Sequence, residues 1–352
     1  MLKHLKLENY RNHQQLEIEL SEITVLIGRN GAGKSNILEA IAMLSFCRSF
    51  RDDAKKNVVF FEADYARIRS GELEVFIQKN PVFLLKPKSK GVARKQSEFI
   101  GQLRCVIFSP ESLELVSGSP KQRRRFLDIM ISQRNPEYLN ALIAYEKVRS
   151  ERNSLLLMIL QHRASEPELD FWDNEIAKYG QIIIGERQKA IGLVNELIST
   201  IYGKISGSPN DHLRIEYESN AIGEDYLGGL AATRRREIAA ARTVFGPHRD
   251  DFRFILNNHD MGNFASRGET KSAVLALKMA ELAFLTNSSK EKPILLLDDV
   301  FSEFDQYRRK QLIEVVQGYQ TVISTTDRSN LSEQLLSHAK IIQLAQCNSQ
   351  NF

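Results

Sequence analysis

Residues 28–35 read Gly28-Arg29-Asn30-Gly31-Ala32-Gly33-Lys34-Ser35, and this stretch is the strongest indication of the fold of the 352-residue chain. It fits G-x-x-x-x-G-K-[ST], the phosphate-binding loop of nucleoside triphosphatases. The apolar, β-branched residues 23–27 before it predict a buried strand, and residues 36–44 after it have the apolar spacing of a helix. Strand, loop and helix in this order direct backbone N–H groups at an anion near a helix N-terminus. The stretch therefore predicts a nucleotide-binding site.

The residue types within the loop suit separate tasks. Glycine is needed where the backbone passes close to a phosphate or takes a positive φ angle. Lys34 is expected to reach the β- and γ-phosphates, and the Ser35 hydroxyl is expected to ligate Mg²⁺. The predicted nucleotide-binding residues here are Gly28, Arg29, Asn30, Gly31, Ala32, Gly33, Lys34, Ser35 and Asn36.

A second apolar run, residues 293–297, ends in the carboxylates Asp298 and Asp299. A buried strand that delivers an acid at its carboxyl end is what a Mg²⁺–nucleotide site requires beside the phosphate loop. Asp298 is expected to hold Mg²⁺ through water, and Asp299 to orient or deprotonate the attacking water. The predicted catalytic residues are thus Lys34, Asp298 and Asp299, and the predicted metal ligands are Ser35 and Asp298.

A third motif, Ser266-Arg267-Gly268-Glu269, precedes a long helical pattern about 30 residues before the carboxylate pair. A hydroxyl, a small residue and free N–H groups at a helix N-terminus form a second anion-binding device. In this position it indicates an ABC-type ATPase, in which such a loop binds the γ-phosphate of ATP held by a partner subunit. Asp305 lies in a stretch that resembles the D-loop at that interface. Where transporters carry a switch histidine, Thr325-Thr326-Asp327 offers a threonine or an aspartate instead.

The composition describes a globular protein with 42% hydrophobic residues and a net charge of only +4. The sequence contains no run of about 18 apolar residues, so no membrane span is predicted. The three cysteines form no C-x-x-C pair, which favours a cytoplasmic protein with reduced thiols. The predicted architecture is an α/β head formed by residues 1–115 and 241–352, with a mainly helical lobe inserted at residues 116–240.

Because the net charge is small, any nucleic-acid surface must be a local patch. Three clusters of Lys and Arg are candidates for phosphate contacts: residues 86–95, 123–125 and 234–236. Each also fits an ordinary solvated surface. A fourth stretch, residues 246–251, crowds His, Arg and two Asp behind a Gly-Pro turn, which suggests a functional loop as well as a set of structural ion pairs.

Taken together, these motifs resemble the RecF family of bacterial recombination mediators, which is related to SMC-type heads. The resemblance covers nearly the full length in family order. The matching stretches are residues 9–12, 28–35, 38–41, 48–51, 118–120, 123–128, 152–156, 246–251, 266–268 and 297–303. The Gly-Pro-His-Arg-Asp-Asp stretch is specific to this family rather than to ABC ATPases at large.

The resemblance implies an ABC-type, SMC-like P-loop ATPase head that binds ATP and Mg²⁺ and forms an ATP-dependent homodimer. It also implies binding to DNA near single-strand/double-strand junctions, cooperation with RecR to load RecA at gaps, slow hydrolysis that resets the clamp, and roles in replication, repair and the SOS response. The alternative is an ABC-type subunit that energises a membrane or nuclease partner. The absent switch histidine and residues 246–251 argue against a membrane partner, and the short insert without sustained heptads argues against a nuclease-associated head.

Overall fold

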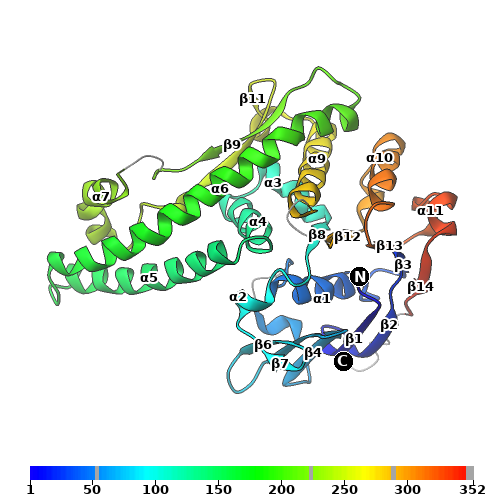
Figure 1. Cartoon of the computed structure of the whole chain (residues 1–352), viewed down its shortest axis with the longest axis horizontal. Coiled ribbons are helices and arrows are strands. Elements are labelled where there is room, and N and C mark those ends of the chain that lie inside the picture. The colour runs from blue at the N-terminus through cyan, green and yellow to red at the C-terminus, as the bar shows by residue number, and fades with distance from the viewer. Residues whose placement is uncertain (52–54, 222–224, 287–290, 346–352) are drawn as a thin grey trace.

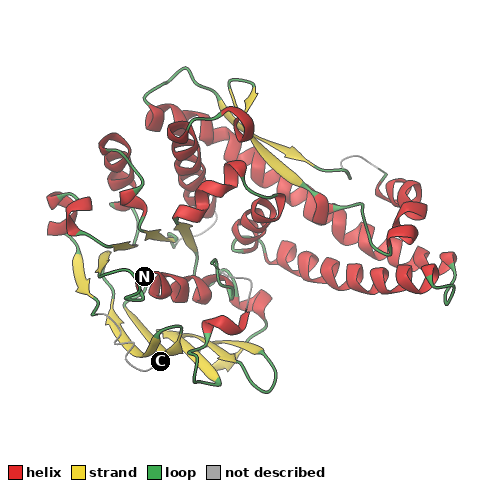
Figure 2. Cartoon of the chain, turned by 180° about the vertical axis from the view of Figure 1, so that it is seen from behind, coloured by secondary structure: helices red, strands yellow, loops and turns green. Residues whose placement is uncertain are grey.

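The computed structural model describes residues 1–51, 55–221, 225–286 and 291–345. Three sheets and a set of long helices make up the molecule, with an antiparallel sheet at one end and an elongated helical region projecting to one side (Figures 1 and 2). A five-stranded parallel sheet lies between them and is the layer on which the other elements pack.

The parallel sheet has the order β14-β3-β13-β12-β8. Its strands are β3 (Ile23–Ile27), β8 (Cys105–Phe108), β12 (Ile294–Asp298), β13 (Thr321–Thr325) and β14 (Lys340–Gln343). Alternate side chains enter different cores: Val25, Leu295 and Leu297 face one, whereas Leu26 and Leu296 face the other. Both faces are therefore covered, as is usual for parallel sheets.

Helix α1 (Lys34–Phe46) packs against one face, between β12 and β13 on one side and β4 on the other. Beyond it lies an antiparallel sheet of order β2-β1-β4-β5-β6-β7. Its strands are β1 (His4–Tyr10), β2 (His13–Glu19), β4 (Tyr65–Ser70), β5 (Leu73–Gln78), β6 (Leu84–Ser89) and β7 (Val92–Ala93). The second core fills the space between the two sheets.

Residues 57–61 have the apolar composition that predicts a strand, but this prediction is wrong. A 3₁₀ turn (Lys55–Val58) occupies the start of this segment, and Val59 forms only an isolated bridge to Tyr10. Strand β4 pairs with residues 6–8 of β1, which leaves only the end of β1 for Val59. The buried Val58 and Val59 instead cover the turn between β1 and β2, while Phe61 stays exposed.

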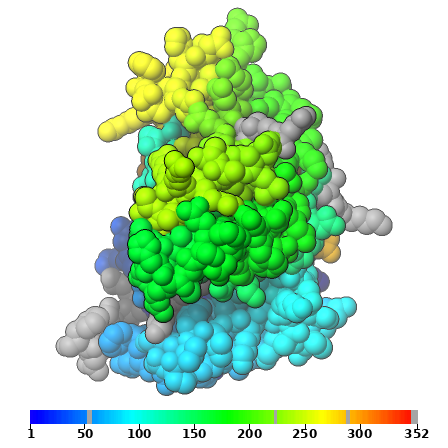
Figure 3. Space-filling view, turned by 90° about the vertical axis from the view of Figure 1, so that its left-hand side faces the viewer, coloured from blue at the N-terminus to red at the C-terminus, as the bar shows by residue number. Residues whose placement is uncertain are grey.

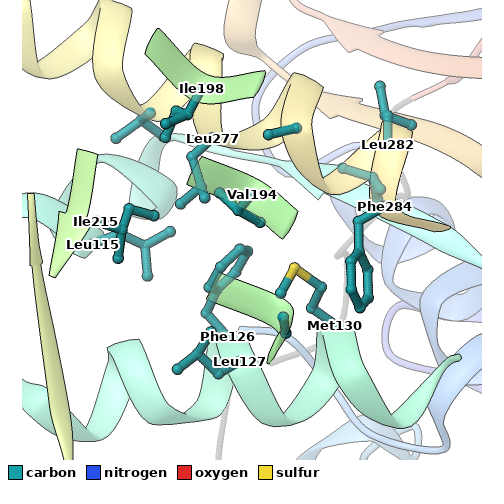
Figure 4. Close-up of a cluster of buried hydrophobic side chains, with 14 of the residues drawn as sticks. Leu115, Phe126, Leu127, Met130, Val194, Ile198, Ile215, Leu277, Leu282 and Phe284 are labelled. Carbon is teal, nitrogen blue, oxygen red and sulfur yellow. The ribbon is translucent and has the colours of Figure 1, made fainter. Parts of the chain in front are cut away.

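The opposite face of the parallel sheet is covered by α9 (Arg267–Thr286), which packs against β8 and α6. Figure 4 shows Leu277 and Phe284 of α9 meeting Phe126 and Met130 of α4 (Pro120–Ser132) and Val194 of α6 (Leu169–Ser206). This first core runs from the sheet into the helical region. Apolar contacts in this core therefore join the helical region to the parallel sheet.

The helical region is built on α6, a 38-residue helix that packs along α5 (Pro136–Leu160). Helix α7 (Tyr226–Ala240) lies across both, and Figure 3 shows the three helices above the antiparallel sheet. Arg152 of α5 is fully buried between Asp173 (2.7 Å) and Glu237 (2.6 Å). This ion-pair set ties α5, α6 and α7 together.

A third sheet, of order β11-β10-β9, lies beside α6. Strand β9 (Leu213–Glu218) pairs with β10 (Asp251–Leu256), which in turn pairs with β11 (His259–Asp260). The pairing joins residues on either side of position 240. The division into 1–115 with 241–352 and an insert of 116–240 stays a prediction.

Short helices complete the described elements: α2 (Gln96–Phe99), α3 (Glu114–Ser117), α8 (Met261–Phe264), α10 (Gln306–Val316) and α11 (Glu333–Ser337). Among the helices described, none is both long and apolar enough to cross a membrane.

Candidate nucleotide site

The predicted phosphate loop joins β3 to α1 at the carboxyl edge of the parallel sheet. Gly31 and Gly33 have φ angles of 82° and 88°, a conformation that side chains disfavour. A Cβ atom on Gly33 would also lie 2.4 Å from Nε2 of His13 and 2.6 Å from Oδ1 of Asn12. Two independent constraints, conformation and space, therefore require glycine at position 33.

Lys34 begins α1 and folds back over the loop. Its Nζ atom donates to the carbonyl oxygens of Gly28 (2.7 Å) and Arg29 (3.1 Å). Burial lowers the pKa of Lys34, and the nearby Asp299 and Asp298 carboxylates partly offset that effect. The ammonium group is thus held over the loop by neutral dipoles, which a phosphate can outcompete.

Asp298, Ser35 and Ser324 meet where β12 and β13 end and α1 begins. The Oδ1 atom of buried Asp298, at the end of β12, accepts from Ser35 Oγ (2.7 Å) and from Ser324 Oγ of β13 (2.6 Å). Hydroxyl and carboxylate oxygens are ligands that Mg²⁺ prefers, with phosphate oxygens and water filling its other positions. The donor set of Ser35 and Asp298 therefore fits the predicted Mg²⁺. Ser324 was not predicted, because a serine at the end of a strand has no distinctive pattern.

Asp299 has a left-handed backbone, with a φ angle of 52°, and its N–H donates to the Ser324 carbonyl (3.2 Å). Its Oδ1 atom is buried without a hydrogen-bond partner among the described residues. Burial raises the pKa of Asp299, while Lys34 acts in the opposite direction. A buried acceptor without a partner beside a phosphate loop suits the predicted task of orienting water.

The turn between β1 and β2 supports the loop from below. Asn12 donates to the Gly31 carbonyl (3.2 Å), and His13 Nε2 lies 3.2 Å from the Gly33 carbonyl. Asn36 donates to Asn12 Oδ1 (2.8 Å) and accepts from Arg51 (2.8 Å). Residues 9–12 were part of the family resemblance, but this supporting role was missed. The contacts link segments that are far apart in the sequence.

The predicted second anion-binding loop lies at the start of α9. Ser266 and Glu269 cap the helix reciprocally: the Ser266 N–H donates to Glu269 Oε2 (2.8 Å), and the Glu269 N–H donates to Ser266 Oγ (3.2 Å). Ser266 and Arg267 are exposed. Arg308 of α10 donates to the Gly268 carbonyl (3.1 Å). The loop is thus held by a hydrogen bond on the side that faces α10, while Ser266 and Arg267 are exposed to solvent.

Asp305 connects this loop to the carboxylate pair. It caps α10 by accepting from the Arg308 N–H (2.9 Å), and this bond lowers the pKa of Asp305. Lys271 of α9 pairs with Glu303 (3.2 Å), four residues after Asp299. In Figure 1, α9 and α1 lie on opposite sides of the parallel sheet. The structure therefore groups the predicted residues into two sets on one chain: residues 28–36 with Asp298 and Asp299, and residues 266–269 with Asp305.

The three basic clusters have different surroundings. Lys86, Lys90, Arg94 and Lys95 are exposed around the β6–β7 turn. Arg123 is buried and forms two hydrogen bonds with Asp251 (2.6 and 2.8 Å), so it is a structural residue. In the third cluster, Arg234 bonds to Asp170 and Asp173 (2.7 and 2.5 Å), whereas Arg235 and Arg236 are exposed.

Comparisons with known proteins agree with this geometry. The family model RecF/RecN/SMC N terminal domain matches residues 1–350. The chain is 35% identical to the DNA replication and repair protein RecF of Lachnoclostridium phytofermentans, over 93% of this chain and 92% of that protein. It is 36% identical to the RecF protein of Chloroflexus aurantiacus, over 95% of both.

Solved structures lead to the same family. A structure of the recombination mediator protein RecF with ATP, in the RecFOR pathway, aligns with a TM-score of 0.87 at 32% identity, covering 94% of this chain and 93% of that one. An Smc head domain of Pyrococcus furiosus aligns with a TM-score of 0.53 at 16% identity, covering 98% of this chain and 94% of that one, which shows the shared fold alone. The chain has the ABC-type ATPase fold of SMC heads and belongs to the RecF family of DNA replication and repair proteins.

Proposed function

We propose that the protein is an ATP-dependent DNA clamp of recombination and repair. ATP binds at residues 28–36 of one copy, and residues 266–269 of a second copy close over its γ-phosphate. The observation that carries this proposal is the exposed Ser266 loop on the far side of the sheet from α1. A helix start that faces solvent offers an anion its remaining N–H groups and the Ser266 hydroxyl, and a second copy would bring it to the nucleotide.

Each residue of the nucleotide edge has a task in this proposal. Lys34 exchanges the Gly28 and Arg29 carbonyls for phosphate oxygens. Ser35 and Asp298 hold Mg²⁺, which would neutralise charge on the phosphates. Asp299 aligns a water through its unpartnered Oδ1 atom. Hydrolysis is slow and stimulated by DNA, and it reopens the dimer.

The DNA and protein partners follow from the family. We infer binding to gapped DNA near single-strand/double-strand junctions, cooperation with RecR in promoting RecA loading, and action in the cytoplasm during replication and the SOS response. The exposed cations at residues 86–95 and Arg235 and Arg236 are available for phosphate contacts.

Sedimentation velocity of the wild-type protein and Ser266→Arg, each with and without ATP and gapped DNA, tests the proposal. The arginine puts a long cationic side chain where a small hydroxyl faces the partner. We expect ATP-dependent dimers that retain DNA for the wild type. Ser266→Arg should bind ATP as a monomer and release DNA.

Ser150→Arg is the matched control, because it places the same side chain at an exposed position on α5. It should dimerise like the wild type. ATP-dependent dimers of Ser266→Arg would contradict the closing role of this loop, and wild-type dimers indifferent to ATP would contradict the clamp itself.

A further inference from the structure

A cavity of about 270 Å³ lies where α4, α5 and α6 meet residues 247–248, away from the nucleotide edge. Its lining holds the charged side chains of Lys121, Arg124, Asp128, Glu146, Arg149 and Arg187, together with Tyr145 and His248. None of these residues belongs to the sets at residues 28–36, 298–299 or 266–269.

The two carboxylates of the lining are already neutralised. Asp128 accepts from Arg187 (2.8 Å), and Glu146 accepts from Arg149 (2.5 Å). Arg187 also bonds to Asp250 (3.1 Å), which lies behind it. Arg187 and Arg149 are thus paired with carboxylates, whereas Arg124 forms no ion pair within the described chain.

Two guanidinium groups of the lining have unused donors. Arg124 is half-buried, and within the described chain it makes one hydrogen bond, to the Asp250 carbonyl (2.6 Å), and no ion pair. The Nε atom of Arg149 is buried and has no partner among the described residues. Buried donors without partners are rare, since each lost hydrogen bond costs about 1–3 kcal/mol.

His248 adds no positive charge to the cavity. Its ring is held by the Tyr145 hydroxyl at Nδ1 (2.7 Å) and by the Thr243 carbonyl at Nε2 (3.0 Å). Burial lowers the pKa of His248 to about 3, and Arg149 and Arg124 add to this effect. The imidazole is therefore neutral and leaves the cavity's charge to the arginines.

We propose that this cavity binds a phosphoryl anion, held by the guanidinium groups of Arg124 and Arg149. A planar guanidinium matches a phosphate with two parallel N–H donors, and partial burial strengthens such bonds. The anion is either a backbone phosphate of nucleic acid or a free phosphate. The first source rests on the proposed function, whereas the second does not.

The position of Arg124 also connects the cavity to the nucleotide edge. Its neighbour Arg125 donates to the Ser49 carbonyl, two residues before Arg51, which bonds to Asn36 (2.8 Å). An anion bound to Arg124 thus contacts α4, and the next residue of α4, Arg125, bonds to the segment beside the phosphate loop.

Two measurements on Arg124→Gln and Arg149→Gln test the site, with Arg163→Gln, at an exposed arginine just after α5, as the matched control. The first is the unfolding temperature in inorganic phosphate against chloride at equal ionic strength. The second is the affinity of the ATP-bound protein for duplex DNA as a function of salt. Circular dichroism and ATP affinity establish that each variant is folded, and if one variant fails to fold, the other decides.

If the ligand is a nucleic-acid phosphate, both cavity variants should lose about tenfold in DNA affinity. The slope of log affinity against log salt should also fall by about one, while Arg163→Gln keeps the slope of the wild type. If it is a free phosphate, the wild type and Arg163→Gln should gain more stability in phosphate than the cavity variants, which retain only the nucleotide site to bind it.

Folded cavity variants that match Arg163→Gln in both measurements would overturn the proposal. A wild-type protein that retains no DNA with ATP would instead refute the proposed clamp. In that case the phosphate measurement alone would still decide whether the cavity binds an anion.

Discussion

The nucleotide edge and the helical region both bury charge, but they stabilise it in different ways. Lys34 is buried against two neutral carbonyls, and within the described residues it forms no ion pair within 4 Å. Arg152 is buried between two carboxylates and the Thr243 hydroxyl (2.9 Å). The first charge is held in place without being neutralised, and the second is neutralised completely.

This difference separates binding residues from structural ones better than charge or burial does. A buried cation beside neutral dipoles gains free energy when an anion arrives. A buried cation between carboxylates gains nothing from a ligand, yet its removal leaves uncompensated negative charge. Three variants, given in order of decreasing expected effect, test this contrast.

The largest effect is expected for Arg152→Leu. Removing the guanidinium leaves Asp173 and Glu237 buried without it, which should lower the free energy of unfolding by about 3–5 kcal/mol. Denaturant titration measures the change. Arg235→Leu, at an exposed site on the same helical region, should stay within about 0.5 kcal/mol of the wild type. A loss of stability for Arg152→Leu no larger than that for Arg235→Leu would mean that the ion pairs of Arg152 do not stabilise the fold.

Lys34→Met should have the opposite profile. The free energy of unfolding should change by no more than about 1 kcal/mol, because only two bonds to loop carbonyls are lost. ATP affinity should fall by about 100-fold or more, the size expected when a preorganised charged donor is removed. Calorimetric titration with ATP measures it, and Lys189→Met, an exposed lysine of α6, is the control. Retained ATP affinity would refute the assigned role of Lys34.

The smallest effect is expected for His248→Gln, and it depends on pH. The folded pKa of His248, about 3, lies below the ordinary value of 6.5, so between these values the unfolded chain binds a proton that the folded chain does not. Stability is therefore full above pH 6.5 and is lost as pH falls, by up to about 1.4 kcal/mol per pH unit. Arg149, Arg249 and Arg124 all oppose protonation in the fold.

Urea unfolding of His248→Gln at pH 7 and pH 5 measures this contribution. From pH 6.5 to pH 5 the wild type should lose up to about 2 kcal/mol more than the variant. His212→Gln, which alters an exposed histidine, should follow the wild type. Parallel curves for the wild type and His248→Gln would show that folding does not lower the pKa of His248.

The sequence predicted the α/β class, the family and the grouping of Ser35 with Asp298. These features need particular residue types at particular spacings, such as glycine where φ is positive. The family match confirms the resemblance, whereas the catalytic, nucleotide and metal assignments stay predictions. Residues 116–240 were also predicted to be mainly helical, and α5 and α6, each with a buried apolar face, lie there.

Three features could not be predicted, for identifiable reasons. Ser324 and His13 are common residue types whose roles arise from contacts between distant segments. Arg123 looks like solvated helix surface until Asp251, 128 residues later, is placed beside it. Residues 57–61 have strand-like composition, but β4 pairs with most of that edge of β1 and leaves only its end for Val59.

The place of β3 in its sheet has a consequence for synthesis. The neighbours of β3 are β13 and β14, whose residues 321–325 and 340–343 are made about 300 residues after it. The N-terminal Leu2 N–H likewise bonds to Gln320 (2.8 Å). Since a chain emerges from its N-terminus, the strand that carries the phosphate loop has no sheet partner until about 300 further residues have been made. A nascent chain should therefore be unable to hold ATP, and nucleotide capture becomes a late check that the last strands have joined the sheet.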